Sequence, residues 1–238
     1  MTSRDWSQHP PYQCPDYQSS VLRGPTRPLL KLAPLYRQQS SIAGELLGRL
    51  TDVYQTRPID CDLTKNGPLG GEPIGERIIV SGRVMDEYGS AVAGALVEIW
   101  QANASGRYLH KVDQHHAPRD PNFIGAGRVI TDRDGHYRFY TIKPGAYPWG
   151  NHVNAWRPQH IHFSVLGATI ATRLVTQMYF PGDPLLELDP IFQAVPAAAQ
   201  THLIAQFDLG LTQADFALGY HFDIVLGGPG ETPADAQG

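Results

Sequence analysis

The chain has 238 residues, of which 42% are hydrophobic and 18% are charged, and its formal net charge is −4 at pH 7. A chain of this length and apolar content can bury a sizeable core, so its composition excludes disorder throughout. We see no basic stripe and no run of 18 apolar residues, which excludes nucleic-acid and membrane-spanning proteins from the expected classes and favours a cytoplasmic one.

Residues 1–75 form the first predicted region, an irregular arm that contains one helix. Prolines interrupt its beginning and prevent long regular elements there. They are Pro10, Pro11, Pro15, Pro25, Pro28 and Pro34. Apolar residues at helical spacing then predict an amphipathic helix over 42–54, with Ser40 or Ser41 as its N-cap. We expect this region to make subunit contacts.

From residue 76 the apolar pattern changes to a period of two, which is typical of strands. Gly, Pro and Asp separate the short runs, and this arrangement predicts an all-β protein with a β-sandwich of mostly antiparallel strands over 76–228. The expected strands are 77–86, 95–101, 128–131, 136–142, 159–166, 173–180 and 220–226. Asp134-Gly135 predicts a hairpin turn. A short helix is expected over 197–208 and a polar tail over 229–238.

The sequence His160-Ile161-His162 is the sharpest local feature of the predicted sandwich. Side chains two residues apart on a strand share one face and lie roughly 6.6–6.8 Å apart. Two imidazoles so placed can converge on one metal ion. Ile161 and Phe163 then face the core. The alternative is a pair of histidines that only pack on a half-buried face.

Residue chemistry alone does not identify the remaining metal ligands of such a site. Arg157, three residues before His160, could hold a fixed cation beside a bound anion or could form a surface ion pair. Other histidines and many carboxylates are available as ligands, and nothing in the spacing selects any of the 11 tyrosines. A zinc hydrolase with a carboxylate ligand is one alternative. A non-catalytic β-sandwich binding module is another.

Several motifs together resemble the intradiol ring-cleavage dioxygenases. One of them is Gly106-Arg107-Tyr108, and all of them occur in the same order along the chain as in the family. They include Ile142–Trp149, Trp156–Phe163, Pro73–Arg77, Leu96–Asn103, Asp120–Phe123 and Gly182–Pro184. The resemblance covers most of the chain, from about residue 73 to 226. It is strongest to the iron-bearing β subunits of the branch that cleaves protocatechuate.

The resemblance implies one non-haem Fe(III) per chain, held by Tyr108, Tyr147, His160 and His162. A phenol titrates near pH 10, yet a bound trivalent cation can keep it deprotonated at neutral pH, as a metal does for a coordinating thiol. Two anionic oxygen ligands also suit a hard ferric ion. The implied ligand set is therefore chemically coherent.

The resemblance also assigns roles around the metal. Tyr147 would leave the metal and accept a substrate proton, and Arg157 would stabilise negative charge with support from Gln177. The implied substrate-binding residues are Arg157, Tyr17, Trp149 and Ile191.

The implied reaction is the cleavage of protocatechuate with O2 to 3-carboxy-cis,cis-muconate, in an αβ hetero-oligomer whose α subunit completes the pocket. A homo-oligomeric enzyme for another catechol is the alternative within the family.

Overall fold

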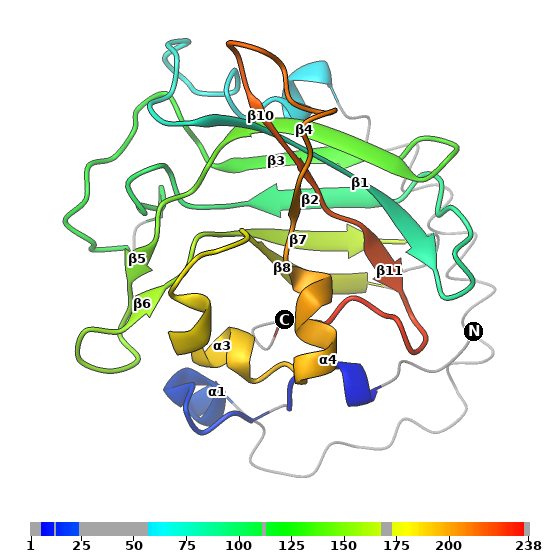
Figure 1. Cartoon of the computed structure of the whole chain (residues 1–238). Helices are drawn as coiled ribbons and strands as arrows, with labels where there is room; N and C mark the ends of the chain where they lie inside the picture. The colour runs from blue at the N-terminus through cyan, green and yellow to red at the C-terminus, as the bar shows by residue number, and fades with distance from the viewer. Residues whose placement is uncertain (1–5, 12, 24–56, 111–112, 168–172, 236–238) are drawn as a thin grey trace.

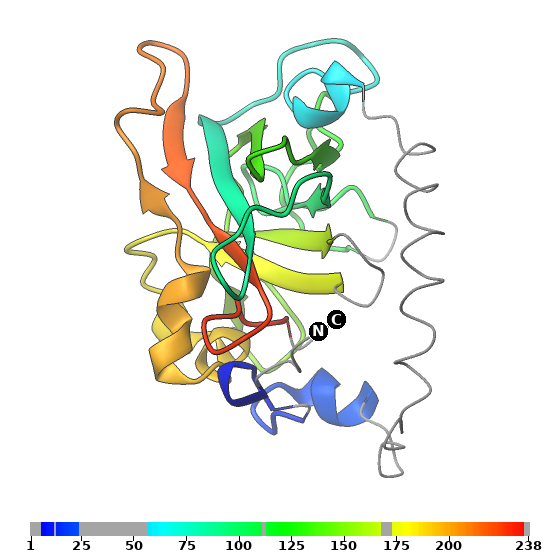
Figure 2. The same ribbon diagram turned by 90° about the vertical axis from the view of Figure 1, so that its right-hand side faces the viewer.

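The computed structural model describes residues 6–11, 13–23, 57–110, 113–167 and 173–235. The helix predicted over 42–54 lies outside these residues. Two β-sheets stack face to face, and a few short helices gather at one end of them (Figures 1 and 2). The predicted all-β sandwich is confirmed.

The first sheet is built around β1 (Arg77–Asp86), the longest strand. β4 (His136–Ile142) pairs with it antiparallel along one edge. Along the other edge, β10 (Leu218–His221) and β11 (Ile224–Leu226) pair with it parallel, one after the other. β9 (Gln206–Phe207) extends the sheet beyond β10. The bounds of β1 and β4 match the predicted strands.

The second sheet has the order β3-β2-β7-β8 and is antiparallel throughout. Its strands are β2 (Leu96–Trp100), β3 (Ala126–Ile130), β7 (His160–Leu166) and β8 (Arg173–Tyr179). A separate two-stranded ribbon of β5 (Tyr147–Pro148) and β6 (Trp156–Arg157) precedes β7. The ribbon therefore ends just before His160, the first residue of β7.

The core lies between the two sheets and follows the alternation of the strands. Ile161 and Phe163 of β7 point into it and are fully buried, as predicted from the sequence, and Val165 is buried beside them. Phe139 of β4 meets Phe163 across the sandwich, with ring centroids 5.9 Å apart. Because these residues face inward, His160 and His162 must face the other side of the sheet.

The helices of the described residues are short. The α-helices are α1 (Gln18–Arg23), α3 (Pro190–Gln193) and α4 (Ala197–Gln200). The 3₁₀ turns are η1 (Trp6–Gln8), η2 (Pro58–Cys61), η4 (Leu186–Leu188) and η5 (Thr201–Leu203). Among these described elements, no helix has the length and hydrophobicity needed to cross a membrane.

The predicted hairpin at Asp134-Gly135 is wrong, although a turn is present. β3 pairs with β2 and β4 pairs with β1, so the turn joins strands of opposite sheets. The Asp132 carboxylate accepts hydrogen bonds from the backbone N–H groups of Asp134 and His136. The Gly135 carbonyl accepts another from the Val84 N–H of β1. These contacts direct β4 away from β3 and onto β1.

The strand predicted over 220–226 is divided into β10 and β11 at Phe222 and Asp223. There the Phe222 carbonyl accepts a hydrogen bond from the Tyr137 hydroxyl at 2.5 Å. It also comes so close to Gly82 that a Cβ at this position would lie 1.7 Å from the carbonyl oxygen. Glycine in the middle of β1 is therefore what allows the parallel strand to be divided here.

The helix predicted over 197–208 is correct only in its first half. α4 and η5 end at Leu203, and β9 begins at Gln206. The Ala205 N–H donates to the Tyr179 carbonyl at the end of β8, which holds the chain extended. Tertiary pairing thus overrides the helical pattern of this segment.

Candidate metal centre

His160 and His162 project from β7 on the face opposite the core. Both are buried, with exposed fractions of 2% and 6%, and their ring centroids lie 4.8 Å apart. The strand holds the pair on one face because Ile161 between them is anchored in the core. The spacing predicted from the sequence is therefore realised as a pair of converging imidazoles.

Two tyrosines from separate segments meet this pair. Tyr147 lies on β5, and its hydroxyl is 3.4 Å from His160 Nε2. Tyr108 follows β2 in a loop, and its ring meets Tyr147 edge to face with centroids 5.5 Å apart. Gly106 makes this approach possible, because a Cβ there would lie 2.1 Å from the Ala146 carbonyl oxygen. The structure thus brings all four sequence-predicted ligands together.

The Tyr108 hydroxyl is buried and forms no hydrogen bond with the described residues. A buried polar group without a partner costs roughly 1–3 kcal/mol, which native structures usually avoid. A bound cation would remove this cost. The orphaned hydroxyl is therefore an independent indication that a ligand or metal belongs at this point.

The two histidines are oriented by different partners. His160 Nδ1 lies 2.7 Å from the Pro158 carbonyl oxygen, so it carries the hydrogen and leaves the Nε2 lone pair toward Tyr147. His162 stacks flat on the Trp100 ring, with centroids 4.9 Å apart and planes 3° apart. Its Nδ1 faces the Asp235 carboxylate at 3.6 Å. Both rings therefore present Nε2 as a potential metal donor.

Burial controls the protonation of the four candidate ligands. It lowers the pKa of His160 well below its usual value, and the nearby Arg157 cation lowers it further. Burial also lowers the pKa of His162, against an opposing effect of Asp235. Both imidazoles are thus neutral at pH 7 and able to bind a metal. Burial raises the pKa values of Tyr108 and Tyr147, so without a cation both remain phenols.

Arg157 lies behind the ligands and is 1% exposed. Its Nε is 3.2 Å from Asp189 Oδ1, and its Nη2 donates to Gln177 Oε1 at 2.6 Å. The same Nη2 donates to the Tyr179 hydroxyl at 3.3 Å. Burial opposes the charge of Arg157, but Tyr179, Asp189 and other neighbours outweigh it and raise its pKa. The guanidinium is therefore a permanent, fixed cation, not the surface ion pair of the alternative interpretation.

The predicted substrate-binding residues lie on the same side of the molecule. Trp149 follows β5, and the Arg157 guanidinium lies 5.4 Å from its ring centroid. Tyr17, just before α1, packs against Trp149 with ring centroids 5.3 Å apart. Ile191 of α3 belongs to the same cluster. The structure thus places Tyr17 from the N-terminal arm beside Trp149 and Ile191, next to Arg157. Contact of these side chains with a substrate stays a prediction.

Sequence reasoning missed four residues around the centre: Trp100, Tyr179, Asp189 and Asp235. Trp100 could have been found from its place on the same face of β2 as Glu98, opposite the core-facing Ile99. Asp189 precedes Pro190 and caps α3 through the Ile191 N–H, a pattern visible in sequence. Asp235 gave no signal, because it lies in the segment that we expected to be a polar tail.

A zinc site made of histidines and a carboxylate finds no support in the described part of the chain. No group of three or more His, Cys, Asp and Glu side chains there is arranged to hold a metal ion. The nearest carboxylate, Asp235, faces Nδ1 of His162 and the amide of Gln177. A donor set at this place needs the two tyrosines.

Comparison with protein families gives two matches along the chain. A family model described as "Dioxygenase" matches residues 51–228. A second, described as "Protocatechuate 3,4-dioxygenase beta subunit N terminal", matches residues 3–34. The two matches together cover the beginning and end of the arm and the sandwich, with residues 35–50 between them.

Individual relatives agree with these families. The protocatechuate 3,4-dioxygenase beta chain of Burkholderia cepacia is 60% identical over 99% of this chain and 97% of its own length. The alpha chain of the enzyme from the same organism is 31% identical over 66% of this chain and 76% of its own. The solved 3-chlorocatechol 1,2-dioxygenase of Rhodococcus opacus has the same fold. Its TM-score is 0.56 at 23% identity, over 72% of this chain and 66% of that one.

Proposed function

Because this chain belongs to the intradiol ring-cleavage dioxygenase family, we propose that it is the iron-bearing β subunit of an enzyme that cleaves protocatechuate with O2. The ring opens between the two hydroxyl-bearing carbons, and both oxygen atoms enter the product, 3-carboxy-cis,cis-muconate. The observation that carries this proposal is 60% identity to a protocatechuate 3,4-dioxygenase beta chain along almost the whole chain. Zinc hydrolysis and a purely structural role are thereby excluded.

The family depends on iron, and the residues at the centre fit a single ferric ion per chain. Two phenols and two neutral imidazoles form a donor set of hard oxygen and borderline nitrogen atoms, which suits Fe(III). The Tyr108 hydroxyl has no hydrogen-bond partner among the described residues, and His160 Nε2 faces the Tyr147 hydroxyl, another proposed ligand. We therefore assign Tyr108, Tyr147, His160 and His162 as its ligands.

When bound, the ferric ion would act as the Lewis acid that holds the catechol oxygens and makes the ring reactive toward O2. Tyr147 is the proposed general base. Tyr147 would be held deprotonated while bound to the ferric ion, and because burial raises the pKa of the free phenol, its Oη would accept a proton from a substrate hydroxyl. The Tyr147 hydroxyl reaches His160 Nε2, which places this base at the edge of the ligand set.

Arg157 stabilises negative charge on the substrate during the reaction. The Asp189 ion pair and the hydrogen bonds to Gln177 and Tyr179 fix the guanidinium before the substrate arrives, so no reorganisation is needed. Gln177 orients Arg157 through its Oε1 atom. Trp149 lies under the guanidinium. With Ile191 and Tyr17, it is proposed to form the wall that receives the aromatic ring.

The α subunit of the same enzyme is the proposed partner. The β chain of B. cepacia has an α chain as its counterpart, and this chain is also related to that α chain. Cytoplasmic action belongs to the proposal as well, and cell fractionation would test it.

The test is co-expression of this chain with its α subunit, followed by a visible spectrum, iron quantification and O2 uptake with protocatechuate. We expect a coloured protein with about one iron per chain, because tyrosinate bound to Fe(III) absorbs visible light. The same measurement on Tyr108→Phe should show loss of iron and colour. Tyr140→Phe is the control, since Tyr140 lies on β4 in the other sheet.

Two results would contradict the proposal. A complex without iron would refute the metal assignment. Rapid turnover of the lone chain on another catechol, with none on protocatechuate, would favour the homo-oligomeric alternative.

A further inference from the structure

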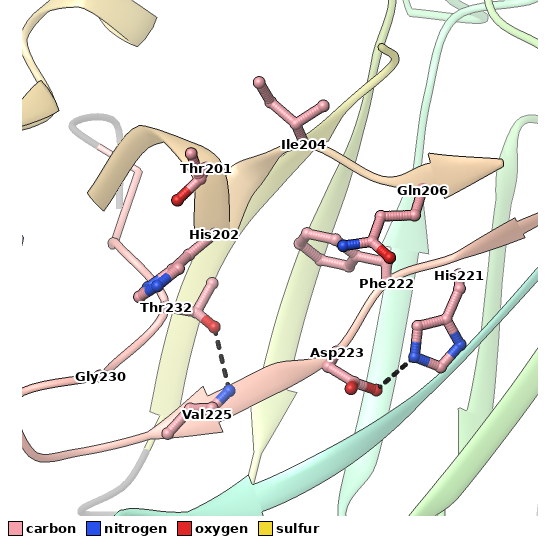
Figure 3. Close-up of a pocket in the computed structure, with 10 residues that line it drawn as sticks. All are labelled: Thr201, His202, Ile204, Gln206, His221, Phe222, Asp223, Val225, Gly230 and Thr232. Carbon is pink, nitrogen blue, oxygen red and sulfur yellow. Dashed lines mark hydrogen bonds and ion pairs between the residues drawn. The ribbon is translucent and has the colours of Figure 1, made fainter. Parts of the chain in front are cut away.

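Residues 229–235, here called the C-terminal strap, pack against the sandwich. Glu231 and Thr232 are 2% and 1% exposed, and Asp235 is 9% exposed. Thr232 exchanges two hydrogen bonds with the Val225 backbone, one from each partner. Figure 3 shows the bond from the Val225 N–H to the Thr232 hydroxyl. The strap is thus a structured element of the fold.

The strap is then fastened to β8 of the second sheet. The Thr176 hydroxyl donates to the Pro233 carbonyl at 2.7 Å. The Asp235 N–H donates to the Val175 carbonyl, also at 2.7 Å. Because β8 lies beside β7 in register, these bonds bring the Asp235 side chain next to the face that carries His162.

The N-terminal arm fixes the strap from outside. His9 is 5% exposed, and its Nδ1 accepts a hydrogen bond from the Ala234 N–H at 2.9 Å. Its Nε2 therefore carries the hydrogen, and this atom lies 3.0 Å from the Glu231 carboxylate. His9 thus satisfies two groups of the strap at once. It also holds the residue immediately before Asp235.

The Asp235 carboxylate faces two residues of the proposed site. Its Oδ2 accepts a hydrogen bond from Gln177 Nε2 at 2.6 Å. The same oxygen is 3.6 Å from His162 Nδ1, which forms no hydrogen bond with the described residues. A buried carboxylate opposite the non-ligating nitrogen of a histidine is the usual means of fixing its tautomer and ring orientation.

The bond to Gln177 also settles which way this amide points. Its Oε1 accepts from Arg157 and from the Tyr179 hydroxyl, while its Nε2 donates to Asp235. A flipped amide would set its NH2 group against the Arg157 donor and its oxygen against the carboxylate. Asp235 therefore helps to fix the acceptor that orients Arg157.

From these contacts we propose that Asp235 is a positioning residue for the metal ligand His162 and for Gln177, held in place by the C-terminal strap and His9. The proposal rests on the proposed function, since it takes His162 as an iron ligand. The two histidines then differ in their support. His160 depends on the backbone carbonyl of Pro158, whereas His162 depends on a side chain that can be replaced.

The experiment measures the rate at which a chelator removes iron from the co-expressed αβ protein, for the wild type and for Asp235→Asn. Loss of a carboxylate behind a metal-bound histidine typically weakens metal binding by about 10–100-fold. We expect iron release to become faster by a comparable factor. Asp235→Glu, which keeps the carboxylate, should restore slow release. A shift of the visible band in Asp235→Asn, with an unchanged melting temperature of the iron-free protein, would separate positioning from general destabilisation.

Asp223→Asn is the matched control. Asp223 lies 3.0 Å from His221 Nε2 in a groove of about 330 Å³ (Figure 3). Gly230 and Thr232 of the strap line this groove, but none of the proposed metal ligands lines it, and neither do Arg157, Gln177 and Asp235. Asp223→Asn, the same substitution beside another histidine, should therefore leave the rate of iron release unchanged.

The results test the proposed function and the role of Asp235 separately. Iron-free wild-type protein would contradict the proposed function. Iron-bearing wild type with equally slow release from Asp235→Asn would overturn the role of Asp235 alone, as would equal effects of the Asn and Glu variants. If Asp235→Asn does not fold, His9→Leu tests the strap without touching the carboxylate. Faster release from it supports the proposal, and unchanged release overturns it.

Discussion

Replacing Arg157 with alanine tests whether its cation contributes to catalysis, to stability or to both. The substitution removes the only ion-pair partner that Asp189 has among the described residues. Asp189 is fully buried, and it keeps the Ile191 N–H at 3.3 Å and the Tyr179 hydroxyl at 3.4 Å. Gln177 also loses a hydrogen bond of 2.6 Å. The variant therefore leaves a buried carboxylate without its cation.

The expected cost in stability follows from this stranded charge. Breaking a buried ion pair by removing one partner typically costs about 3–5 kcal/mol. For a chain of this size each kcal/mol lowers the melting temperature by roughly 2–4 °C. Turnover should fall independently, by roughly 10²–10³, because a preorganised charge is lost from the site. Iron and colour should remain, since Arg157 is not a proposed ligand.

The assay compares Arg157→Ala with the double variant Arg157→Ala/Asp189→Asn. Thermal melting reports stability, and O2 uptake with protocatechuate reports turnover. Neutralising Asp189 removes the stranded charge, so the double variant should recover most of the lost stability. It should not recover turnover, because the cation is still missing.

The pH dependence gives a second check. In the wild type, burial raises the pKa of Asp189, and the Arg157 cation opposes this rise. Without Arg157 the pKa must rise further above its unfolded value of about 3.9. A group with a raised folded pKa stabilises the fold below the unfolded pKa, and this stability is lost as pH rises through the folded pKa. The deficit of Arg157→Ala should therefore be largest near neutral pH and shrink in acid.

Wild-type turnover in either variant would refute the role of Arg157 in catalysis. An Arg157→Ala protein as stable as the wild type at neutral pH would refute the argument from the buried carboxylate.

Three further predictions concern single side chains. Tyr108→Phe should stabilise the iron-free protein, by up to about 1–3 kcal/mol, because it removes a buried hydroxyl that has no hydrogen-bond partner among the described residues. Tyr137→Phe should instead cost about 1–3 kcal/mol by leaving the buried Phe222 carbonyl without its donor, and equal melting temperatures of the two variants would contradict this. Gly82→Ala should destabilise the fold by about 1–3 kcal/mol or more, measured by denaturant unfolding, since its Cβ would overlap the Phe222 carbonyl. Burial raises the pKa of the Cys61 thiol, so mass spectrometry should show slower alkylation at pH 8 than for an unfolded control, and equal rates would show that the thiol is accessible and ionised.

The sequence was sufficient where function depends on local spacing. The period of two over β1, β4 and β7 predicted these strands almost residue by residue. It also predicted that His160 and His162 share a face away from the core, because alternation along a strand is a property of the backbone itself. Motif resemblance then predicted Tyr108 and Tyr147 as further ligands, which spacing alone could not select.

Only the tertiary structure decided which distant groups support those residues. Asp189 and Asp235 come from separate segments after β8, yet both reach the network around Arg157 and Gln177. The sequence marked 229–238 as a polar tail, but the burial of Asp235 depends on His9 and β8, which are far away along the chain. For the same reason, the sequence did not predict that β4 pairs with β1 of the first sheet. A turn sequence specifies a reversal of the chain, while pairing with β1 is decided by which partner buries the core side chains.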